Sequence, residues 1–202
     1  MSGDPDRPLT DPRALRALAH PVRLALLELL ATGGPLTATE AGAQLGESPS
    51  NCSFHLRTLA RYGFVAEATG GRGRQRPWRR INPGVTIATD ELDPDDRPTG
   101  AALIDLLHAR EAARLATWTA VEHTFPAAWR SAAVDHHALV HVTAAELATL
   151  GSAIQQLLRQ YTGREPGSRP ADAMPVALVV HGVPIPASAE PVPRKARPAD
   201  EH

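Results

Sequence analysis

The sequence predicts a mostly α-helical protein with one small β-hairpin, divided into a basic N-terminal domain and an acidic C-terminal domain. Apolar residues recur at helical spacing through most of the chain, and in the N-terminal half the spacing changes to alternation near residues 64–81. Residues 1–84 hold 11 arginines and 7 acidic residues, whereas residues 85–202 hold 10 basic and 15 acidic residues. The basic half is therefore the one expected to meet a polyanion.

The first two helices are marked by prolines. Asp11 followed by Pro12 predicts a helix start with Asp11 as the N-cap. Pro21 disfavours helix in the residue before it, so one helix should end near residue 20 and a second should begin there. The glycine pair 33–34 should stop the second helix.

Two further helices follow and are joined by a tight turn. Thr37 should cap a short helix, because Glu40 three residues later completes a capping box. Ser48 should cap the next helix, which we expect over residues 49–62, with Pro49 at its first position. Inward apolar contacts of this helix are expected from Phe54, Leu56 and Leu59.

Alternating residues then predict a β-hairpin. The segment FVAEAT should form one strand and RQRPWRRI the returning strand, with the glycines of GGRG at the tip. Residues 70–76 carry arginines, so the tip should be an arginine-bearing wing. Trp78 is expected to anchor this wing to the helices.

The order helix, helix, short helix, turn, helix and hairpin predicts a winged helix-turn-helix domain over residues 12–82. A DNA major groove is about 12 Å wide and admits one α-helix. The helix over residues 49–62 should lie there, and wing arginines should contact the DNA backbone or minor groove. On this basis the expected DNA contacts are Ser50, Asn51, Ser53, His55, Arg57, Arg72, Arg74 and Arg76.

The stretch ALAHPVRLALLELLATGGPLTATEAGAQLGESPSNCSFHLRTLARYGFVAEA resembles the winged-helix domain of ArsR-like bacterial transcription regulators. The opening HPVRLALLELL, the recognition helix SPSNCSFHLRTLARYGFV and the arginine-bearing wing carry the resemblance. It implies a cytoplasmic homodimer that binds operator DNA, commonly as a repressor. It also adds Ser48 to the expected DNA contacts.

The chain departs from the metal-sensing members that it resembles. The short helix TATEAGAQLG lacks the cysteine pair of their first site. Their second site is begun by Asp135 and His137, but its later positions hold Ala148 and Gly151. We therefore expect no metal ion and no cofactor.

Three features allow two interpretations. Cys52 could be a redox switch or a small buried filler, and the filler is favoured. His55 could read a base or cover the hydrophobic seam, and DNA contact is favoured. His136, His137 and His141 could bind a metal, but solvated or structural roles are favoured.

The rest of the chain is divided by composition. We expect a loose leader over residues 1–11, a linker over 83–100, a dimerisation and possible effector domain over 101–186, and a disordered tail over 187–202.

The C-terminal domain should be α+β, with the order helix, strand, helix, strand. A long helix is expected over 101–124, strands over 137–142 and 175–182, and a helix capped by Thr143 and Glu146 between the strands. An apolar stripe on the long helix is the expected dimer interface: Ile104, Leu107, Leu115, Trp118 and Val121.

The leading hypothesis is a sequence-specific transcriptional regulator whose partners are double-stranded DNA, a second copy and a small-molecule effector of unknown identity. The alternative is a winged-helix protein-interaction module without specific DNA binding, and a wing with several arginines and one nearby acid, Glu67, favours DNA. The sequence lacks the G-x-S-x-G, H-E-x-x-H, P-loop and GxGxxG motifs, so we expect no enzyme. It lacks a signal peptide and any run of about 18 apolar residues, which predicts a cytoplasmic protein without membrane contact.

Overall fold

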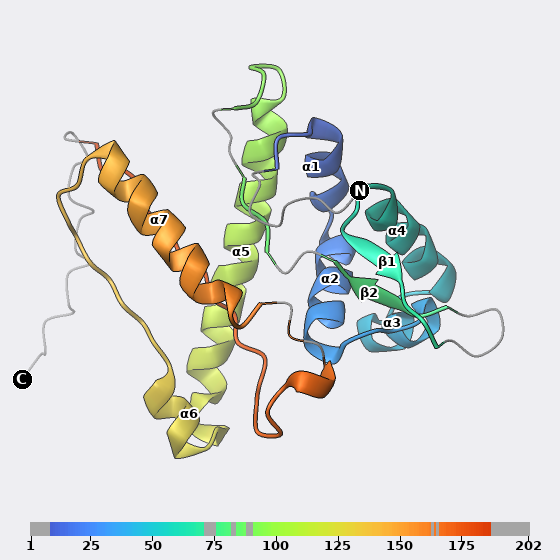
Figure 1. Cartoon of the computed structure of the whole chain (residues 1–202). Helices are drawn as coiled ribbons and strands as arrows, with labels where there is room; N and C mark the ends of the chain where they lie inside the picture. Colours follow the sequence, from blue (N-terminus) through green and yellow to red (C-terminus); the bar gives the residue numbers. More distant parts are fainter. Residues whose placement is uncertain are drawn as a thin grey trace, which may run out of the picture.

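The chain is mostly helical, with one two-stranded antiparallel sheet. The computed structural model describes residues 9–70, 76–81, 84–87, 91–162, 164 and 166–186. Helices α1 to α4 and the sheet form one body, and the long helix α5 leads from it to α6 and α7 (Figure 1). This arrangement confirms the expected fold class, a mostly helical protein with a winged helix-turn-helix domain.

The first two helices, α1 (Pro12–Leu18) and α2 (Pro21–Gly33), begin where the prolines predict. The carboxylate of Asp11 caps α1 by accepting a hydrogen bond from a backbone N–H two residues on. His20 caps α2, because its ring Nδ1 accepts a hydrogen bond from the Val22 N–H at 3.2 Å. The histidine at this junction therefore has a capping role as well as a packing role.

Helices α3 (Ala38–Leu45) and α4 (Pro49–Arg61) form the helix-turn-helix. The capping box at α3 is present: the Thr37 hydroxyl accepts from the Glu40 N–H at 3.2 Å, and the Glu40 carboxylate accepts from the Thr37 N–H at 2.8 Å. Ser48 caps α4 as expected. Local capping chemistry thus fixes where both helices begin.

Two glycines allow the tight turn between α3 and α4. Gly46 ends α3 with φ +69°, a left-handed conformation that favours glycine. A Cβ placed on Gly42 would lie 2.7 Å from the backbone oxygen of Glu47. The chain therefore passes so close to α3 that residue 42 has no room for a side chain.

The hairpin follows α4 and consists of β1 (Val65–Glu67) and β2 (Trp78–Arg80), which pair antiparallel. Trp78 also pairs with Leu36, donating to its carbonyl at 2.8 Å and accepting from its N–H at 3.0 Å. The Trp78 side chain packs against the core, as expected for the anchor of the wing.

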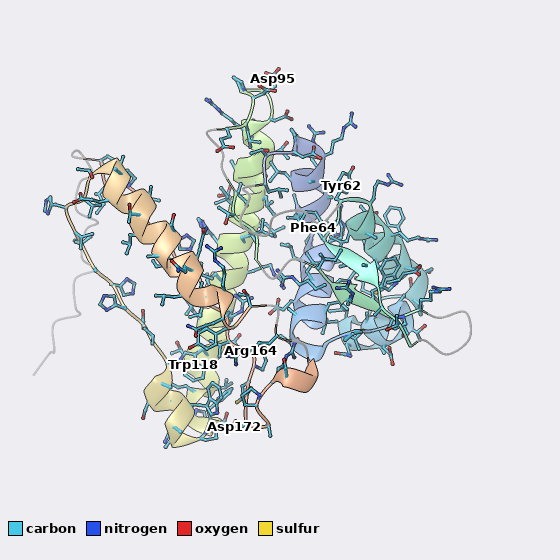
Figure 2. The ribbon with its side chains drawn as sticks, in the orientation of Figure 1. Tyr62, Phe64, Asp95, Trp118, Arg164 and Asp172 are labelled. Carbon is cyan, nitrogen blue, oxygen red and sulfur yellow. The ribbon has the colours of Figure 1, made fainter. Side chains whose placement is uncertain are left out.

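One apolar core joins these elements. Tyr62 and Phe64 lie where α4 leads into β1 (Figure 2), and Phe64 is buried. The large side chains with almost no exposed surface come from α1, α2, α4, β1 and the long helix that follows the hairpin: Leu15, Leu18, Leu26, Cys52, Leu56, Leu59, Val65 and Leu103.

Helix α5 (Arg97–Val121) is fixed to the winged-helix body by apolar and ionic contacts. Leu103 is fully buried in the core. Glu28 of α2 accepts hydrogen bonds from Arg110 and from Arg114. Burial would raise the pKa of Glu28, but these two guanidinium groups lower it below its ordinary value.

No helix in the described part of the chain is both long and apolar enough to cross a membrane.

The segment expected as a linker over 83–100 is partly integrated into the fold. Helix α5 already begins at Arg97, and Leu92 is buried in the core. Ile87 forms a parallel bridge with Leu9 of the expected leader. Prolines and acids dominate this segment by composition, but its isolated apolar residues attach it to the body.

The C-terminal half contains α6 (Ala127–Ala132), α7 (Ala144–Arg159) and two short 3-10 turns, Glu122–Thr124 and Pro166–Ser168. The capping box of Thr143 with Glu146 is present at the start of α7. Most side chains of this half are exposed.

The two strands expected in the C-terminal half are not found in the described residues, so that prediction is wrong. Residues 137–142 and 175–182 form no strand pair with any described residue, so the described chain beyond residue 97 contains helices and non-helical segments only. Their apolar and β-branched composition suits a strand, but a strand is stable only when a partner strand supplies its hydrogen bonds. The pattern alone does not contain that partner.

Candidate nucleic-acid interface

Helix α4 has two distinct faces. Its buried face consists of Cys52, His55, Leu56 and Leu59, which lie on one side of the helix, since 55 and 56 are three and four residues from both 52 and 59. Its opposite side, called here the outer face, consists of Ser50, Ser53, Phe54, Arg57 and Arg61. Short polar side chains, one aromatic ring and two cations therefore point away from the body.

The N-terminus of α4 is occupied by local hydrogen bonds. The Ser48 hydroxyl accepts from the Asn51 N–H at 3.1 Å and lies 3.1 Å from the Ser50 hydroxyl. The Asn51 amide donates to the Glu47 carboxylate at 2.8 Å. Ser48 and Ser50 are exposed, whereas Asn51 is half-buried and already paired.

His55 is a correction to the expected contact set. Only 6% of its surface is exposed, and its ring lies against that of His20, with centroids 4.5 Å apart. Burial lowers the pKa of His55, and the neighbouring charges of His20 and Arg23 lower it further. A buried imidazole on the inner side of α4 belongs to the core and not to a DNA-facing surface.

Phe54 is exposed, whereas it was expected to face inward. The exposed fraction of its surface is 59%, and it lies on the outer face of α4. Helical spacing explains this, because Cys52, Leu56 and Leu59 define a buried stripe on which residue 55 lies and residue 54 does not. The same spacing in the sequence would have predicted a buried His55 and an exposed Phe54.

Cys52 is fully buried in the core. Burial raises the pKa of its thiol, and the charge of Glu47 raises it further. A buried neutral thiol is a poor nucleophile, which favours the filler interpretation.

The hairpin places Arg76 beside α4, where it lines the same pocket as Ser53 and Arg57. Arg76 is exposed and forms an ion pair with Glu67 of β1, at 3.4 Å between Nη1 and Oε2. Arg79 is exposed and Arg80 is half-buried, as alternation along β2 requires. Arg72 and Arg74, which were also expected to contact DNA, lie outside the described residues.

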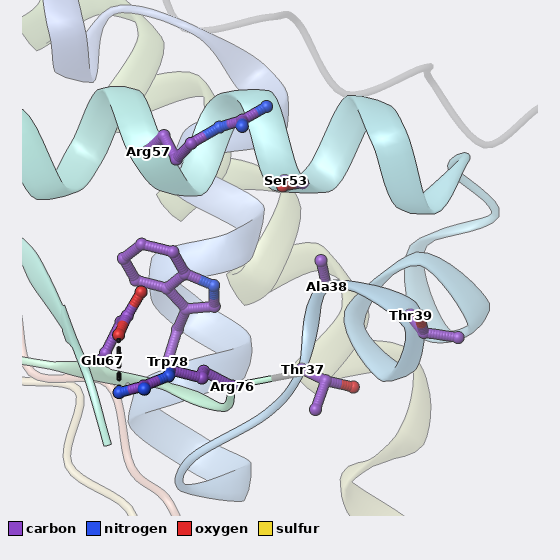
Figure 3. A pocket seen from close by; sticks show the side chains of 8 residues that line it. All are labelled: Thr37, Ala38, Thr39, Ser53, Arg57, Glu67, Arg76 and Trp78. Carbon is purple, nitrogen blue, oxygen red and sulfur yellow. Dashed lines mark ion pairs between the residues drawn. The ribbon is translucent and has the colours of Figure 1, made fainter. Parts of the chain in front are cut away.

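A pocket of about 380 Å³ lies where α3, α4 and the hairpin meet (Figure 3). Ser53 and Arg57 border it from α4, and Arg76 borders it from the hairpin. The structure thus brings together three of the expected contact residues from two separate elements. The remaining residues that line the pocket are Thr37, Ala38, Thr39, Glu67 and Trp78.

The chemistry of this pocket suits a phosphate or a base edge. Arg57 and Arg76 supply cations, while the Thr39 and Ser53 hydroxyls can donate hydrogen bonds. Glu67 is the acid that borders the pocket, and its pair with Arg76 partly neutralises the hairpin cation. Thr37 and Thr39 were not among the contacts expected from the sequence. Their position at the start of the first helix of the helix-turn-helix could have indicated that they lie beside α4.

The residues of the expected dimer stripe on α5 differ in their exposure to solvent. Ile104 and Leu107 are half-buried, and Leu107 packs against the core of its own chain. Leu115 and Val121 are exposed, at 56% and 37% of their surface. Trp118 is half-buried and packs edge-to-face on Phe125, with centroids 5.1 Å apart.

The histidines of the C-terminal half lie on the surface. The His137 ring contacts the Asp135 carboxylate at 2.9 Å, and both side chains are about nine-tenths exposed. Within the described ranges, no three His, Cys, Asp or Glu side chains gather closely enough to hold a metal ion.

Several solved structures share features with this chain at low similarity. Reduced HlyU from Vibrio cholerae is 22% identical, with 46% of this chain and 84% of that chain covered and a TM-score of 0.30. The apo form of a ZitR mutant from Lactococcus lactis is 15% identical, with 71% and 84% covered and a TM-score of 0.32. A MarR family regulator from Neisseria meningitidis is 18% identical, with 71% and 81% covered and a TM-score of 0.32. Scores of this size carry no argument about function.

The family comparison is more specific. A comparison with curated proteins finds no match. Residues 18–68 match the family model described as a helix-turn-helix domain. This range begins in α1, includes α2 to α4 and ends just beyond β1. Over residues 18–68 the chain is therefore similar to the helix-turn-helix domain family, and the hairpin completes a winged-helix fold.

Proposed function

We propose that this protein is a sequence-specific DNA-binding transcriptional regulator. The observation that supports it is the pocket between α4 and the hairpin, which Ser53, Arg57 and Arg76 border together. A helix with an outer face of short polar, aromatic and cationic residues fits a major groove of about 12 Å. The hairpin arginines would then follow the neighbouring phosphates.

The proposed contacts fall into two groups. Ser50, Ser53 and Phe54 face outward from α4 and would meet base edges. Arginines, together with Ser48 at the helix cap, would meet phosphates and position the helix: Arg57, Arg72, Arg74 and Arg76. His55 is left out because it is buried, and Asn51 would need to release Glu47 before it could read a base.

In more detail, the regulator would be an ArsR-like homodimeric repressor that acts in the cytoplasm. The resemblance over residues 12–82 supports the family, and the exposed Leu115 and Val121 of α5 support a second copy. A two-fold dimer would read two half-sites about one DNA turn apart, which a monomer cannot do. A small-molecule effector would act through the C-terminal half.

The test is fluorescence anisotropy with a labelled duplex from upstream of the protein's own gene and a scrambled duplex, at about 150 mM salt. A specific regulator should prefer its site by about 10³-fold or more. Replacing Arg57 and Arg76 with alanine should weaken binding to both duplexes and reduce the slope of log K against log salt by about 2.

The matched control is Arg130→Ala, which removes an exposed arginine from α6, away from the hairpin. It should leave affinity and salt slope unchanged. Failure of the wild-type protein to bind either duplex at low salt would reject the proposal and favour a protein-interaction module.

A further inference from the structure

The C-terminal half exposes an unusual amount of apolar surface. Of the 19 large apolar side chains that are exposed in the described residues, 16 lie between residues 115 and 185. Large apolar surfaces left exposed on a protein often mark a site of contact with another molecule. This half is therefore the place to look for such a contact.

Two non-helical segments carry most of these side chains. The first segment is residues 134–142, which lead from α6 to α7, and the second segment is residues 175–185, which follow the last 3-10 turn (Figure 1). Neither segment forms a backbone hydrogen bond with another described residue. Two edges of unpaired N–H and C=O groups are therefore available for pairing.

The second segment already lies against its own chain on one side. The ring of His181 packs edge-to-face on His108 of α5, with centroids 4.8 Å apart. A Cβ on Gly182 would lie 3.0 Å from Leu147 of α7. Meanwhile Leu178 and Val180 remain 63% and 59% exposed. The segment is thus positioned by α5 and α7 while an apolar side remains open.

We propose that a second copy of this chain covers this surface by strand exchange. The first segment of each protomer pairs with the second segment of its partner, which gives two reciprocal ladders related by a two-fold axis. Each protomer offers one copy of each segment, so the reciprocal arrangement pairs every segment once and closes with two protomers. Apolar side chains on the two segments are buried in the same step.

Charge and size favour a second copy over other partners. Residues 174–186 contain no Asp, Glu, Lys or Arg, so the second segment offers no charge to a nucleic acid, a lipid headgroup or a charged peptide. A standard interface takes about 20–30 residues from each partner. The two segments together contain 20 residues, which reaches the lower end of that range on one protomer.

This inference rests on the proposed homodimer but not on DNA binding. It differs from a dimer held by the α5 stripe alone, because it predicts that backbone ladders at residues 134–142 and 175–185 hold the protomers together. Sedimentation equilibrium measures the oligomeric state, and fluorescence anisotropy measures DNA binding. The proposed dimer and the proposed DNA binding can therefore fail independently.

The test is sedimentation equilibrium of the full chain with Val140→Pro and, separately, Val179→Pro. Proline removes a ladder N–H and opposes pairing in a central strand. We expect the dimer dissociation constant to rise by at least about 30-fold in each variant, or about 2 kcal/mol. The matched control is Ala171→Pro, in a turn where proline is favoured, and it should dimerise like the wild type.

A second measurement separates exchange between chains from pairing within one chain. Leu139→Cys and Leu178→Cys are made in separate Cys52→Ala chains, mixed, and treated with a short bis-maleimide. Strand exchange predicts a covalent dimer that contains one chain of each kind. A third chain that carries both cysteines is treated in the same way. Cross-linking within this doubly substituted chain but not between the two singly substituted chains, proline variants that dimerise like the wild type, or a monomeric wild-type protein would each overturn the inference.

Discussion

The imidazole ring of His55 packs against that of His20, with centroids 4.5 Å apart and planes tilted by 40°. His20 caps α2, whereas His55 lies on the buried face of α4, so the contact joins the start of one helix to the middle of the other. Among the described residues, the Nδ1 of His55 has no hydrogen-bond partner. Burial lowers the pKa of both rings, and the charge of Arg23 lowers both further.

This pair predicts that the protein loses stability in mild acid. Because both pKa values are lowered in the folded state, the unfolded state binds more protons as the pH falls through the ordinary histidine value of about 6.5. The free energy of unfolding should therefore decrease between about pH 7.5 and pH 5.5. Glu47 opposes the shift of both rings without reversing it.

Thermal unfolding at both pH values measures this effect. The double variant His20→Asn with His55→Leu keeps a capping side chain on α2 and removes both rings, so its melting temperature should depend less on pH. His123→Asn, on an exposed turn, removes a histidine elsewhere and should behave like the wild type. An unchanged pH dependence in the double variant would assign the effect to other groups.

Gly42→Ala should destabilise the helix-turn-helix. The new methyl group would meet the Glu47 backbone oxygen at 2.7 Å, and a backbone atom cannot move aside as a flexible side chain can. We expect a loss of about 1–3 kcal/mol in the free energy of unfolding, measured by urea denaturation. Gly151→Ala is the control, because nothing lies within 4 Å of the added Cβ on α7 and alanine favours helix. Equal stability of the two variants would contradict the close approach at Gly42.

Phe54→Ala should weaken DNA binding without weakening the fold. The ring is 59% exposed on the outer face of α4, so its removal leaves no cavity in the core. Contact with a thymine methyl group would make it worth about 10-fold in affinity for the specific duplex. Anisotropy titration and thermal unfolding of the same variant measure both effects. Phe125→Ala, which removes a ring from the neighbourhood of Trp118, should not change DNA affinity.

Glu67→Gln should strengthen DNA binding. Glu67 is half-exposed and pairs with Arg76 at 3.4 Å, so the pair adds little stability but places a negative charge beside the pocket. Its neutralisation releases Arg76 for a phosphate, which should raise affinity at low salt and steepen the salt dependence by up to about 1. The control Glu122→Gln neutralises an acid at the end of α5 and should leave the salt slope as it was. A weaker complex after Glu67→Gln would mean that the carboxylate itself reads a base.

Leu115→Glu should shift the protein toward the monomer. Leu115 is 56% exposed on the expected dimer stripe, and burying a carboxylate in an apolar interface is costly. Ala113→Glu is the matched control, because residue 113 is also exposed but lies on the opposite side of α5. Sedimentation at micromolar concentration distinguishes them, and a Leu115→Glu protein that still dimerises like the control would remove the stripe from the interface.

Features with a local cause could be predicted from the sequence. The caps at Asp11, Thr37, Ser48 and Thr143 each depend on side chains within three residues, and each is present in the structure. The hairpin was also predictable, because its two strands are neighbours in the chain and pair with each other.

Features with a distant cause could not be predicted in the same way. Burial of Leu92 and the bridge between Leu9 and Ile87 depend on residues far apart in the chain. Whether residues 137–142 and 175–182 form strands depends on a partner strand that the local pattern does not specify. His55 is an intermediate case, since its helical position placed it on the buried stripe while its polar side chain suggested an outer role.

Helix α5 has a mechanical consequence for the whole molecule. Its 25 residues make a rod about 38 Å long, and Leu103, Arg110 and Arg114 hold it to the body along its first 18 residues. Seven residues, or about 10 Å of helix, lie beyond the last of these contacts. A rearrangement of α2 beside the recognition helix would therefore be carried along α5 as a rigid rod and reach the C-terminal half without amplification.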